Sequence, residues 1–579
     1  MKHQSNFTPD LQAAYDIDLK ALDAAKDRWA RTSLDDRIAV LQAVKDNLMR
    51  VADEWVDAAG KAKGIPQGSP LLGEEWTSGP YAVMSCCNGL IDTLSQMEGK
   101  TFLDGLKKRS LPSGQTAVRV VPHSIWDRLL ISGVHADVWM QKGVTPANLK
   151  NNAASAYDIP ADQRRGKVAL VLGAGNIAAI TPLDAFQKLF LENQVVLLKM
   201  NPVNDYLTEP LQAALKPLID RDALRIHRGD GPAGAYLTTH PLVEEIHITG
   251  ARATHDLIVW GPGEEGEKNK AANTPKNTRH MTSELGAVCP TIVVPGPWTK
   301  ADLRFQAENI ATMKLHNGGF NCVAVQSLIL PKGWDKTAEL MGNVADVMAK
   351  HTKRAAYYPG AEDRQQAFVD HAKSPQKLDR GADVAPLYLA DMAEGDSDWL
   401  AQTEVFTSAL GVMHIEAQDA ETYMIEAIKW ANDTLYGTLG GNIIIHPATI
   451  RAMGRKRFEE IIAEFRYGAI AINAWSGLAF LVTACPWGGF AGATLQNVQS
   501  GVGTVHNTFM LENVERTVIE APFRPFPRNL LSGGMSLLPR PPWFVSNKRQ
   551  HHIGRLLTRF QYKPSWFKLP RIFFHALLG

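Results

Sequence analysis

A single cysteine near the middle of the chain stands in a setting that suits nucleophilic chemistry. Cys322 ends the segment Asn317-Gly-Gly-Phe-Asn-Cys322, which contains a glycine pair and two amide side chains. Glycines let a ligand come close to the backbone, and amide groups can donate hydrogen bonds to a developing oxyanion. The thiol would need a pKa below its usual value of roughly 8.5 to attack near neutral pH. The alternative is a small buried hydrophobe, the commoner fate of a lone cysteine.

An upstream carboxylate is the matching candidate for a general base. Glu284 lies in the segment Ser-Glu-Leu-Gly-Ala-Val-Cys-Pro, between an expected strand and a loop. Burial there would raise its pKa toward the range in which a carboxylate accepts protons efficiently at neutral pH. The alternative is a loop carboxylate whose hydrogen bonds are satisfied locally. Taken one at a time, the structural alternatives for Glu284 and Cys322 are the commoner outcomes.

A glycine-containing turn marks a candidate nucleotide site. Gly173-Ala-Gly175-Asn176 follows an expected strand and precedes an expected helix, as in the dinucleotide-binding fingerprint, where the backbone and a helix N-terminus face a pyrophosphate. The fingerprint also needs an acidic residue about 20 residues later. Here the second strand ends in Lys199, and the next acid is Asp205. Either the cofactor is held differently or the motif is only a tight turn.

Alternating strands and helices are expected to carry these residues. The pattern predicts strands at residues 167–172, 195–200, 223–227 and 243–249, and helices at 183–194, 208–219, from about 232, and at 253–259. Such alternation is typical of βαβ units around a parallel sheet. Residues 1–60 read as amphipathic helix, and residues 261–277 read as a solvated loop or insertion. A second α/β stretch opens at 291–294 and runs to about 490, and residues 512–520 predict a strand.

The C-terminal tail differs in composition from the body. Residues 521–579 hold ten Lys and Arg, no Asp or Glu, ten aromatic residues and eight prolines, so the tail carries +10 against −9 for the first 520 residues. We expect the tail to pack across the acidic body of its own or a neighbouring subunit. Peripheral contact with an anionic membrane through 523–579 is the alternative, because residues 564–578 mix Trp, Phe and Leu with Lys568 and Arg571. Nothing in the body favours nucleic acid.

Overall composition excludes several classes of protein. Hydrophobic residues make up 45% and charged residues 21% of the 579 positions, which is ordinary for a globular protein and excludes a mostly disordered or collagenous chain. No run approaches the 18 apolar residues of a membrane span. Five scattered cysteines predict neither a disulfide framework nor a metal site. We therefore expect a cytoplasmic protein with free thiols.

Taken together, several ordered segments favour the functional interpretations of these residues over the structural ones. Asn176 precedes Lys199 by 23 residues, and Thr249-Gly250, Glu284-Leu-Gly286, Cys322, Glu404-Val-Phe406, Asn473 and Pro486-Trp-Gly-Gly489 follow in that order. From about residue 120 to 520, this order and its spacings resemble the aldehyde dehydrogenase superfamily. A chance match of so many ordered segments is improbable.

The resemblance implies a role for each matching residue. Cys322 matches the nucleophile, the Asn176 amide and the Cys322 backbone N–H match the oxyanion hole, and Glu284 matches the base that activates water. Lys199 matches the residue that binds the adenosine ribose, and Thr249-Gly250 begins the loop over the pyrophosphate. Glu404 matches the residue that binds the nicotinamide ribose, with Phe406 packing nearby.

Some positions depart from the family pattern. The family's usual Glu-Leu-Gly-Gly-Lys is replaced by Glu284-Leu-Gly-Ala-Val. The family's Gln two residues before the nucleophile is replaced by Phe320. After Gly250, Arg252 brings a cation toward the phosphates. The acid that can grip a ribose 2′-hydroxyl three residues past the lysine is replaced by Pro202. Because that acid is a reason to reject a 2′-phosphate, either NAD or NADP is expected.

The fold expected from the resemblance is α/β, with two doubly wound open-sheet domains, an oligomerisation strand region and a C-terminal tail. We predict N-terminal helices and a cofactor domain in residues 1–286, a catalytic domain in 287–490, a return segment and oligomerisation strand in 491–522, and a basic aromatic extension in 523–579.

The function expected from the resemblance is NAD(P)-dependent oxidation of a small-molecule aldehyde to a carboxylic acid by a homodimer or tetramer. A strand near Thr517 could then join a neighbouring subunit's sheet. One alternative is a CoA-acylating relative that reduces or forms acyl-CoA, and another is a non-catalytic scaffold that docks through its tail.

Overall fold

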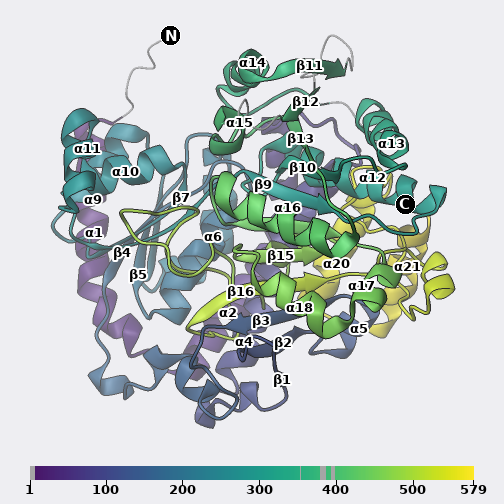
Figure 1. The fold of residues 1–579 in the computed structure, drawn as a ribbon. Coiled ribbons are helices and arrows are strands. Elements are labelled where there is room, and N and C mark those ends of the chain that lie inside the picture. The colour runs from purple at the N-terminus through teal and green to yellow at the C-terminus, as the bar shows by residue number, and fades with distance from the viewer. Residues whose placement is uncertain (1–6, 352–353, 379–386, 393–397) are drawn as a thin grey trace.

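Two open sheets organise the computed structural model, which describes residues 7–351, 354–378, 387–392 and 398–579 (Figure 1). The expected α/β class and its two sheets are confirmed. The smaller sheet has five strands in the order β6-β5-β4-β7-β8. Their bounds are β4 Val168–Leu172, β5 Val195–Lys199, β6 Leu224–His227, β7 Glu245–Gly250 and β8 His280–Leu285.

All neighbouring strands of this sheet run parallel. From β4 the chain first moves one way to β5 and β6 and then returns past β4 to β7 and β8. The connections that leave the carboxyl ends of β4 and β7 therefore run in opposite directions. Such a topological switch point is where open α/β sheets bind their ligands. Register places Thr249 beside Glu284 at that end of the sheet.

Helices cover this sheet and join its strands. α1 (Pro9–Ala30) and α2 (Leu34–Ala62) precede it, and α6 (Ile180–Phe186), α9 (Gly231–Thr239) and α10 (Arg252–Trp260) connect its strands. The helix expected at 183–194 begins three residues earlier and ends as a π-helix at Gln187–Leu191. The helix expected at 208–219 is split into α7 (Thr208–Ala214) and α8 (Lys216–Ile219), where Pro217 lacks the N–H that would continue the ladder.

The interpretation of residues 261–277 as a loop was wrong. This stretch contains α11 (Gly263–Ala272), which is capped by a left-handed Asn273. Its first turn contains Glu264 and Glu265, and its last turn contains Lys270. Those charges suit the helix dipole at each end, and Lys270 also pairs with Asp256 at 2.8 Å. A polar helix of this kind has no apolar stripe to reveal it in the sequence.

The larger sheet has eleven strands in the order β1-β2-β3-β16-β15-β14-β9-β10-β13-β12-β11. Its bounds are β1 Lys107–Ser110, β2 Thr116–Val121, β3 His135–Met140, β9 Cys289–Val293, β10 Val325–Pro331, β11 Lys373–Leu378, β12 Leu387–Met392, β13 Ala409–Ile415, β14 Gly440–Ile444, β15 Ala469–Ile472 and β16 Val514–Glu520. The run from β16 to β12 is parallel, with antiparallel strands at both ends.

Helices between these strands complete the second layer of this half. They are α12 Lys300–Leu315, α13 Thr337–Lys350, α14 Ala361–His371, α15 Asp398–Gln402, α16 Ala420–Thr434, α17 Pro447–Met453, α18 Arg455–Ala463 and α19 Gly477–Leu481. α12 packs on β10, while α16 packs on β9 and β13.

The strand near Thr517 does not offer an edge to a neighbouring subunit. It is β16, and it pairs in parallel with β15 on one side and antiparallel with β3 on the other. Thr517 itself is aligned with Ala469 and Val138. Since both edges are already hydrogen-bonded within the chain, this strand cannot extend another sheet without first leaving its own.

The tail packs on the body of its own chain, as expected. α20 (Gln550–Tyr562) lies against α3 (Leu72–Trp76) and α4 (Ala82–Leu94), and α21 (Leu569–Leu577) folds back on α20. In Figure 1 these C-terminal elements gather at one end of the molecule beside α5 (Ile125–Leu130). No helix in the described part of the chain has the length and apolar character to cross a bilayer.

Candidate active site

A cavity of about 230 Å³ lies at the switch point of the smaller sheet. It brings together seven of the eight residues singled out from the sequence, which come from both halves of the chain: Asn176, Thr249, Gly250, Glu284, Cys322, Glu404 and Phe406. Lys199 is the predicted residue that does not line it.

The loop that presents Cys322 has an unusual backbone. After α12 the chain passes through Asn317, Gly318 and Gly319, with φ angles of 53°, 69° and 86°. Three successive residues in the left-handed region make a tight reversal, which glycine adopts without steric cost and Asn tolerates better than most residues. The reversal returns the chain toward the cavity, and Trp475 then holds the residue after the nucleophile by donating to the Val323 carbonyl at 2.9 Å.

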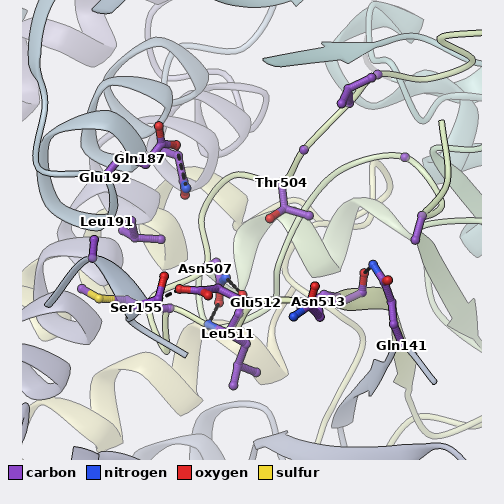
Figure 2. A pocket seen from close by; sticks show the side chains of 18 of the residues that line it. Gln141, Ser155, Gln187, Leu191, Glu192, Thr504, Asn507, Leu511, Glu512 and Asn513 are labelled. Atoms are coloured by element: carbon purple, nitrogen blue, oxygen red, sulfur yellow. Dashed lines mark hydrogen bonds between the residues drawn. The ribbon is translucent and has the colours of Figure 1, made fainter. Parts of the chain in front are cut away.

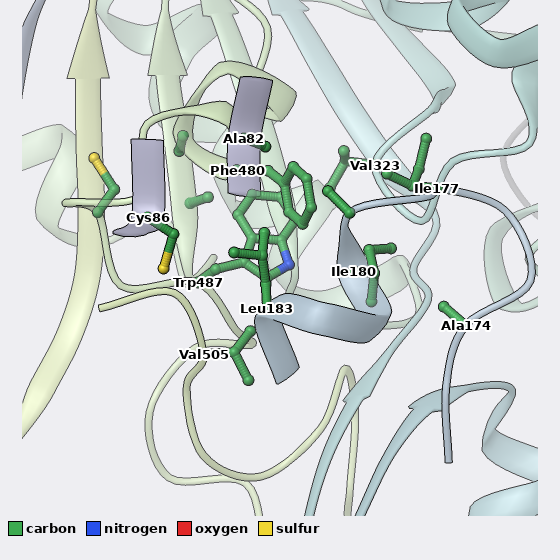
Figure 3. Packing of buried hydrophobic residues seen from close by; sticks show 14 of the residues in the cluster. Ala82, Cys86, Ala174, Ile177, Ile180, Leu183, Val323, Phe480, Trp487 and Val505 are labelled. Carbon is green, nitrogen blue, oxygen red and sulfur yellow. The ribbon is translucent and has the colours of Figure 1, made fainter. Parts of the chain in front are cut away.

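Apolar packing fixes the same loop from behind. Figure 3 shows Val323 in a cluster with Ile177 and Ile180, which follow Asn176, and with Phe480 and Trp487. The Phe480 and Trp487 rings meet edge to face at 5.5 Å between centroids. Because buried side chains are close-packed, this cluster couples the position of the cysteine loop to that of the Gly173–Asn176 turn.

Glu284 lies beside Cys322 at this cavity, and each group influences the pKa of the other. The Glu284 Oε1 atom is buried with no hydrogen-bond partner among the described residues. Burial, reinforced by the negative charge of Asp184, raises the pKa of Glu284 to about 8. Burial also raises the pKa of the Cys322 thiol well above its usual value, and Glu284 and Glu404 add to this effect. The protein alone therefore keeps the thiol protonated and places beside it a carboxyl group that is deprotonated as pH rises through about 8.

Asn176 faces the nucleophile loop with its side chain. Its Nδ2 donates to the Phe320 carbonyl at 3.0 Å, two residues before Cys322. An amide nitrogen carries two hydrogens, so one further donor remains for a group in the cavity that Asn176 lines.

A buried ionic network supports this arrangement from the far side. Lys63, at the end of α2, pairs with Glu75 at 2.9 Å and also donates to the Asn176 carbonyl at 3.0 Å and to Asn317 Oδ1 at 3.3 Å. Both Lys63 and Glu75 are only 1% exposed. Every donor of the ammonium group thus has an acceptor, as a buried charge requires.

A second ion pair holds the same loop. Glu74 pairs with Arg354 at 2.8 Å and accepts the Asn317 backbone N–H at 2.9 Å. The Tyr357 hydroxyl lies 3.1 Å from the Asn176 carbonyl, to which it donates. Asn317, the first residue of the cysteine segment, is therefore the point where two ion pairs and the Asn176 loop meet.

Glu404 lies in the cavity opposite the turn. A Cβ atom at Gly286 would collide with its carboxyl group, so the retained glycine of Glu284-Leu-Gly286 makes room for this carboxyl. Burial raises the pKa of Glu404 to about 8, although Arg364 and Lys314 act in the opposite direction. Its Oε1 is buried with no hydrogen-bond partner among the described residues, which is the state expected of an acceptor reserved for a ligand.

The remaining predicted cofactor residues are arranged around the sheet's carboxyl end. Thr249 donates from its hydroxyl to Asp184 at 2.7 Å. Lys199 ends β5, and its Nζ donates to the Gly229 carbonyl at 2.8 Å. Burial lowers the pKa of this lysine to about 8. Arg252, expected near phosphates, instead stacks on Tyr436 at 4.4 Å from the ring centroid.

Several residues around the cavity were missed at the sequence level. Tyr358, Arg364 and Asn201 line it, and Lys63, Glu74 and Arg354 support it. The Arg364 guanidinium donates to the Val405 carbonyl at 3.0 Å, next to Phe406. The local sequence signal for these residues was the Tyr357-Tyr358-Pro-Gly segment between Arg354 and Arg364. It does not reveal their partners, several of which are distant in sequence.

A larger cavity of about 590 Å³ lies elsewhere, and none of the predicted site residues lines it. Figure 2 shows its polar rim, with Ser155 beside Glu512 and Gln187 beside Glu192. The Glu512 carboxylate accepts the Ser155 backbone N–H at 2.7 Å. Its other acids are also engaged, since Glu192 pairs with Lys188 and Glu245 with Lys167, so size alone does not make it the catalytic site.

Comparison with known proteins gives a consistent family. A model of the aldehyde dehydrogenase family matches residues 186–514. Aminoaldehyde dehydrogenase 2 of Pisum sativum is 26% identical over 287 residues, which are 46% of this chain and 50% of that protein. Geranial dehydrogenase of Castellaniella defragrans is 25% identical over 232 residues, 37% of this chain and 43% of that protein. The chain thus spans about half the length of the curated relatives it matches.

The likeness in structure is more extensive than the likeness in sequence. Aldehyde dehydrogenase C of Pseudomonas syringae, in complex with NAD+ and octanal, superposes with a TM-score of 0.57 at 17% identity, covering 89% of this chain and 90% of that one. An NADP-dependent glyceraldehyde-3-phosphate dehydrogenase of Bacillus halodurans, in complex with NADP, gives 0.57 at 17% identity, covering 88% and 91%. At such identity the likeness is one of fold.

Proposed function

Since this chain belongs to the aldehyde dehydrogenase family, we propose that it oxidises an aldehyde to a carboxylic acid with NAD or NADP. The observation that carries the proposal is the meeting of Cys322, Glu284, Asn176 and Glu404 at one cavity. A thiol, a base beside it, an amide donor and an acceptor for a ribose hydroxyl are the parts that this reaction needs.

The first step follows from the position of Glu284 beside Cys322. The carboxylate takes the thiol proton, and the thiolate forms a bond to the aldehyde carbon, giving a thiohemiacetal. The oxygen that becomes negative is stabilised by the Asn176 amide and the Cys322 backbone N–H. Burial raises the pKa of both groups, so a free thiolate is unfavourable in this site. In the proposed step the thiolate forms only as its proton passes to Glu284 and its sulfur attacks the aldehyde.

The second step leaves an acyl thioester on Cys322. When bound, the nicotinamide cofactor supplies the acceptor for the hydride that leaves the thiohemiacetal carbon. Once its first proton has passed to solvent, Glu284 acts again as a base and removes a proton from water as the water oxygen attacks the thioester. The carbon–sulfur bond breaks, the carboxylic acid departs, and the cysteine is regenerated.

The residues present fit a nicotinamide dinucleotide. Glu404 offers a buried carboxyl oxygen without a partner among the described residues, and Phe406 packs against Phe320 and Tyr358 beside it. A Cβ at Gly175 would press on Asn201 and Tyr358, so the glycine keeps this side of the cavity open. We assign Lys199, Thr249, Gly250, Glu404 and Phe406 to cofactor binding. Pro202 carries no charge against a 2′-phosphate, so NAD and NADP stay alternatives.

The test is the appearance of reduced nicotinamide absorbance with short, long and aromatic aldehydes. Both cofactors are compared, each with and without CoA. Turnover without CoA supports the hydrolytic dehydrogenase. Turnover only with CoA supports the acylating alternative, in which the thioester passes to a thiol and Glu284 has no water to activate. Silence across the panel with a folded protein would contradict catalysis and favour the scaffold.

A further inference from the structure

The C-terminal end of the molecule exposes far more apolar surface than the rest of it. The described residues include 14 large apolar side chains that are exposed to solvent, and nine of them lie in residues 530–578. A tenth, Ile125, lies on α5. The other four lie apart from one another, three on separate helices and Ile159 in a connecting segment. Single exposed hydrophobes are ordinary, but a concentration of this kind marks an interaction surface.

These side chains belong to one region, which we call the C-terminal face: α5, residues 530–537 and residues 566–578. Trp126 of α5 contacts Trp566 at 4.7 Å between ring centroids. Two residues after the end of α5, the Ser132 hydroxyl accepts the Leu537 backbone N–H at 3.0 Å. Arg540 donates to the carbonyl of the terminal Gly579 at 3.3 Å, which joins the two tail segments. Figure 1 shows α5, α20 and α21 together at this end.

The helix α21 is apolar on its solvent side as well as its buried side. Leu569 and Ile572 face the body and are buried. Phe574 of α21 and the capping residue Leu578 are 60% and 51% exposed, beside the exposed Arg571. Phe567, in the 3-10 turn Trp566–Lys568 just before the helix, is 95% exposed. A surface helix normally presents polar residues on its solvent side, so these exposed side chains have no role in holding the fold.

The tail brings charges of one sign to this face, while the acid of α5, Asp127, accepts the backbone N–H groups of His123 and Ser124. The tail contains ten Lys and Arg and no Asp or Glu. The body's acids opposite it are engaged: Asp302 binds Arg524 and Arg528, Glu308 binds Arg540, and Asp53 binds Arg555. Lys563 and Arg571, which flank the exposed aromatic residues, have no ion pair among the described residues and remain exposed.

We propose that the C-terminal face docks onto an anionic lipid bilayer surface. Exposed Trp, Phe and Leu beside Lys and Arg are the chemistry of a helix lying in the headgroup region, where apolar side chains enter the acyl boundary and cations meet anionic headgroups. At about 1.5 Å per residue, the nine residues of α21 lie in this interface rather than cross it. The face is separate from the catalytic cavity, so docking leaves the proposed chemistry open to solvent-borne cofactor.

The test is sedimentation of the full chain with vesicles, without substrate or cofactor, so that its result is independent of the proposed activity. We expect the protein to pellet with phosphatidylcholine mixed with phosphatidylglycerol and to stay in solution with phosphatidylcholine alone. Phe567→Ser/Phe574→Ser should weaken binding by about tenfold or more. Lys563→Gln and Arg571→Gln should each weaken it by about fivefold. Raised salt should act like the charge substitutions.

The matched control is Ile17→Ser/Leu257→Ser, which removes two exposed apolar side chains elsewhere and should leave binding unchanged. All variants alter solvent-facing positions, so unchanged circular dichroism and thermal midpoint establish that they fold. Failure of the wild type to pellet with anionic vesicles would overturn the proposal. So would a concentration-dependent oligomer that the Phe567→Ser/Phe574→Ser variant dissolves without any vesicle binding, because the face would then join two copies of the chain.

Discussion

At the scale of single residues, the active-site electrostatics differ from what the motifs alone suggested. A nucleophilic thiol was expected to have a lowered pKa, yet burial raises the pKa of Cys322 and that of its neighbour Glu284. Each group influences the protonation of the other, so the relevant quantity is the proton transfer between them rather than either pKa alone. Glu284 was expected to have a raised pKa, and the structure gives it one.

Cys322→Ala should abolish aldehyde oxidation, with kcat reduced by roughly 10⁴-fold or more, as for loss of other covalent nucleophiles. The structural reason is that no other thiol lines the cavity in the part of the chain that the structure describes. Cys485→Ala is the control, because Cys485 is a free thiol that lies outside the cavity. Turnover by the Cys322 variant at the wild-type rate would refute covalent catalysis.

Glu284→Gln should stall the enzyme with an acyl adduct on Cys322, detectable by mass spectrometry of the intact protein after mixing with aldehyde and cofactor. In the wild type, kcat/KM should rise with pH around a midpoint near 8, because only the deprotonated Glu284 is a base and its pKa is about 8. The variant should lack this rising limb. An unchanged pH profile would remove Glu284 from the role of base.

Rising pH should increase the activity that depends on Glu284, but the same carboxyl group should make the fold less stable as pH rises. Its folded pKa of about 8 exceeds the ordinary value of 4.5, so the folded state holds a proton that the unfolded state releases between those pH values. Stability therefore falls as pH rises through that window. Glu284→Gln removes this loss, and its thermal midpoint at pH 8 to 9 should exceed that of the wild type, a gain that accompanies loss of function.

At the scale of elements, the end of α2 positions the catalytic loop. Lys63 holds Glu75, the Asn176 carbonyl and Asn317 at once. Asn176 and Asn317 belong to the turn after β4 and to the loop after α12, which are the two segments that must meet for an oxyanion hole to form. The ion pair thus acts on the reacting residues through the backbone and is a positioning device.

Lys63→Met should destabilise the fold by roughly 3–5 kcal/mol, because it leaves the Glu75 charge buried and unpaired. It should also lower kcat by about tenfold to a hundredfold, since a displacement of 1 Å at the reacting groups has such an effect. Lys63→Met/Glu75→Gln should recover part of the stability but not kcat. Unfolding midpoints and steady-state kinetics on the same preparations separate the two effects.

Lys188→Met is the matched control for this prediction. Lys188 is also 1% exposed and pairs with Glu192 at 2.7 Å, but its partners are Glu192 and Glu245 rather than the Asn176 and Asn317 segments. We expect a comparable loss of stability with kcat unchanged. A Lys63 variant with reduced stability and a normal kcat would show that the network is structural only.

At the scale of the whole molecule, the tail is joined to the catalytic half by charge. Asp302 caps α12 and binds Arg524 through both oxygens at 2.7 Å, and Arg528 adds a third contact at 2.6 Å. Although burial alone would raise it, these partners lower the pKa of Asp302 to about 2. The first part of the tail is therefore an integral part of the fold, while its last helix carries the proposed docking face.

Asp302→Asn should lower the free energy of unfolding at pH 7 by about 3 kcal/mol and leave kcat unchanged. In the wild type, this group's contribution is present above pH 3.8 and is lost as pH falls toward about 2, so acid should narrow the difference between the two proteins. Asp53→Asn is the control, because its pair with Arg555 is half exposed and contributes under about 1 kcal/mol. Equal losses for both variants would contradict a special role for Asp302.

The sequence by itself determined most of the local elements and which residues are candidates for the reacting groups. The turn at Gly173–Asn176, the strands of the smaller sheet and the ordered motifs from Asn176 to Glu404 depend on near neighbours and on spacing, which are readable along one chain. The polar helix α11 escaped because nothing apolar marks it. The assignment of roles to Cys322, Glu284, Asn176 and the cofactor residues stays a prediction that the experiments above address.

Only the tertiary structure decided which distant segments meet. The pairing of β16 with its own β15 and β3, the convergence of Lys63 and Arg354 on Asn317, and the packing of the tail beside α5 join residues that are far apart in sequence. Such contacts are selected by the shape and charge of the assembled core rather than by local propensity. The same is true of the raised pKa values in the cavity, because burial belongs to the folded molecule and not to the residue.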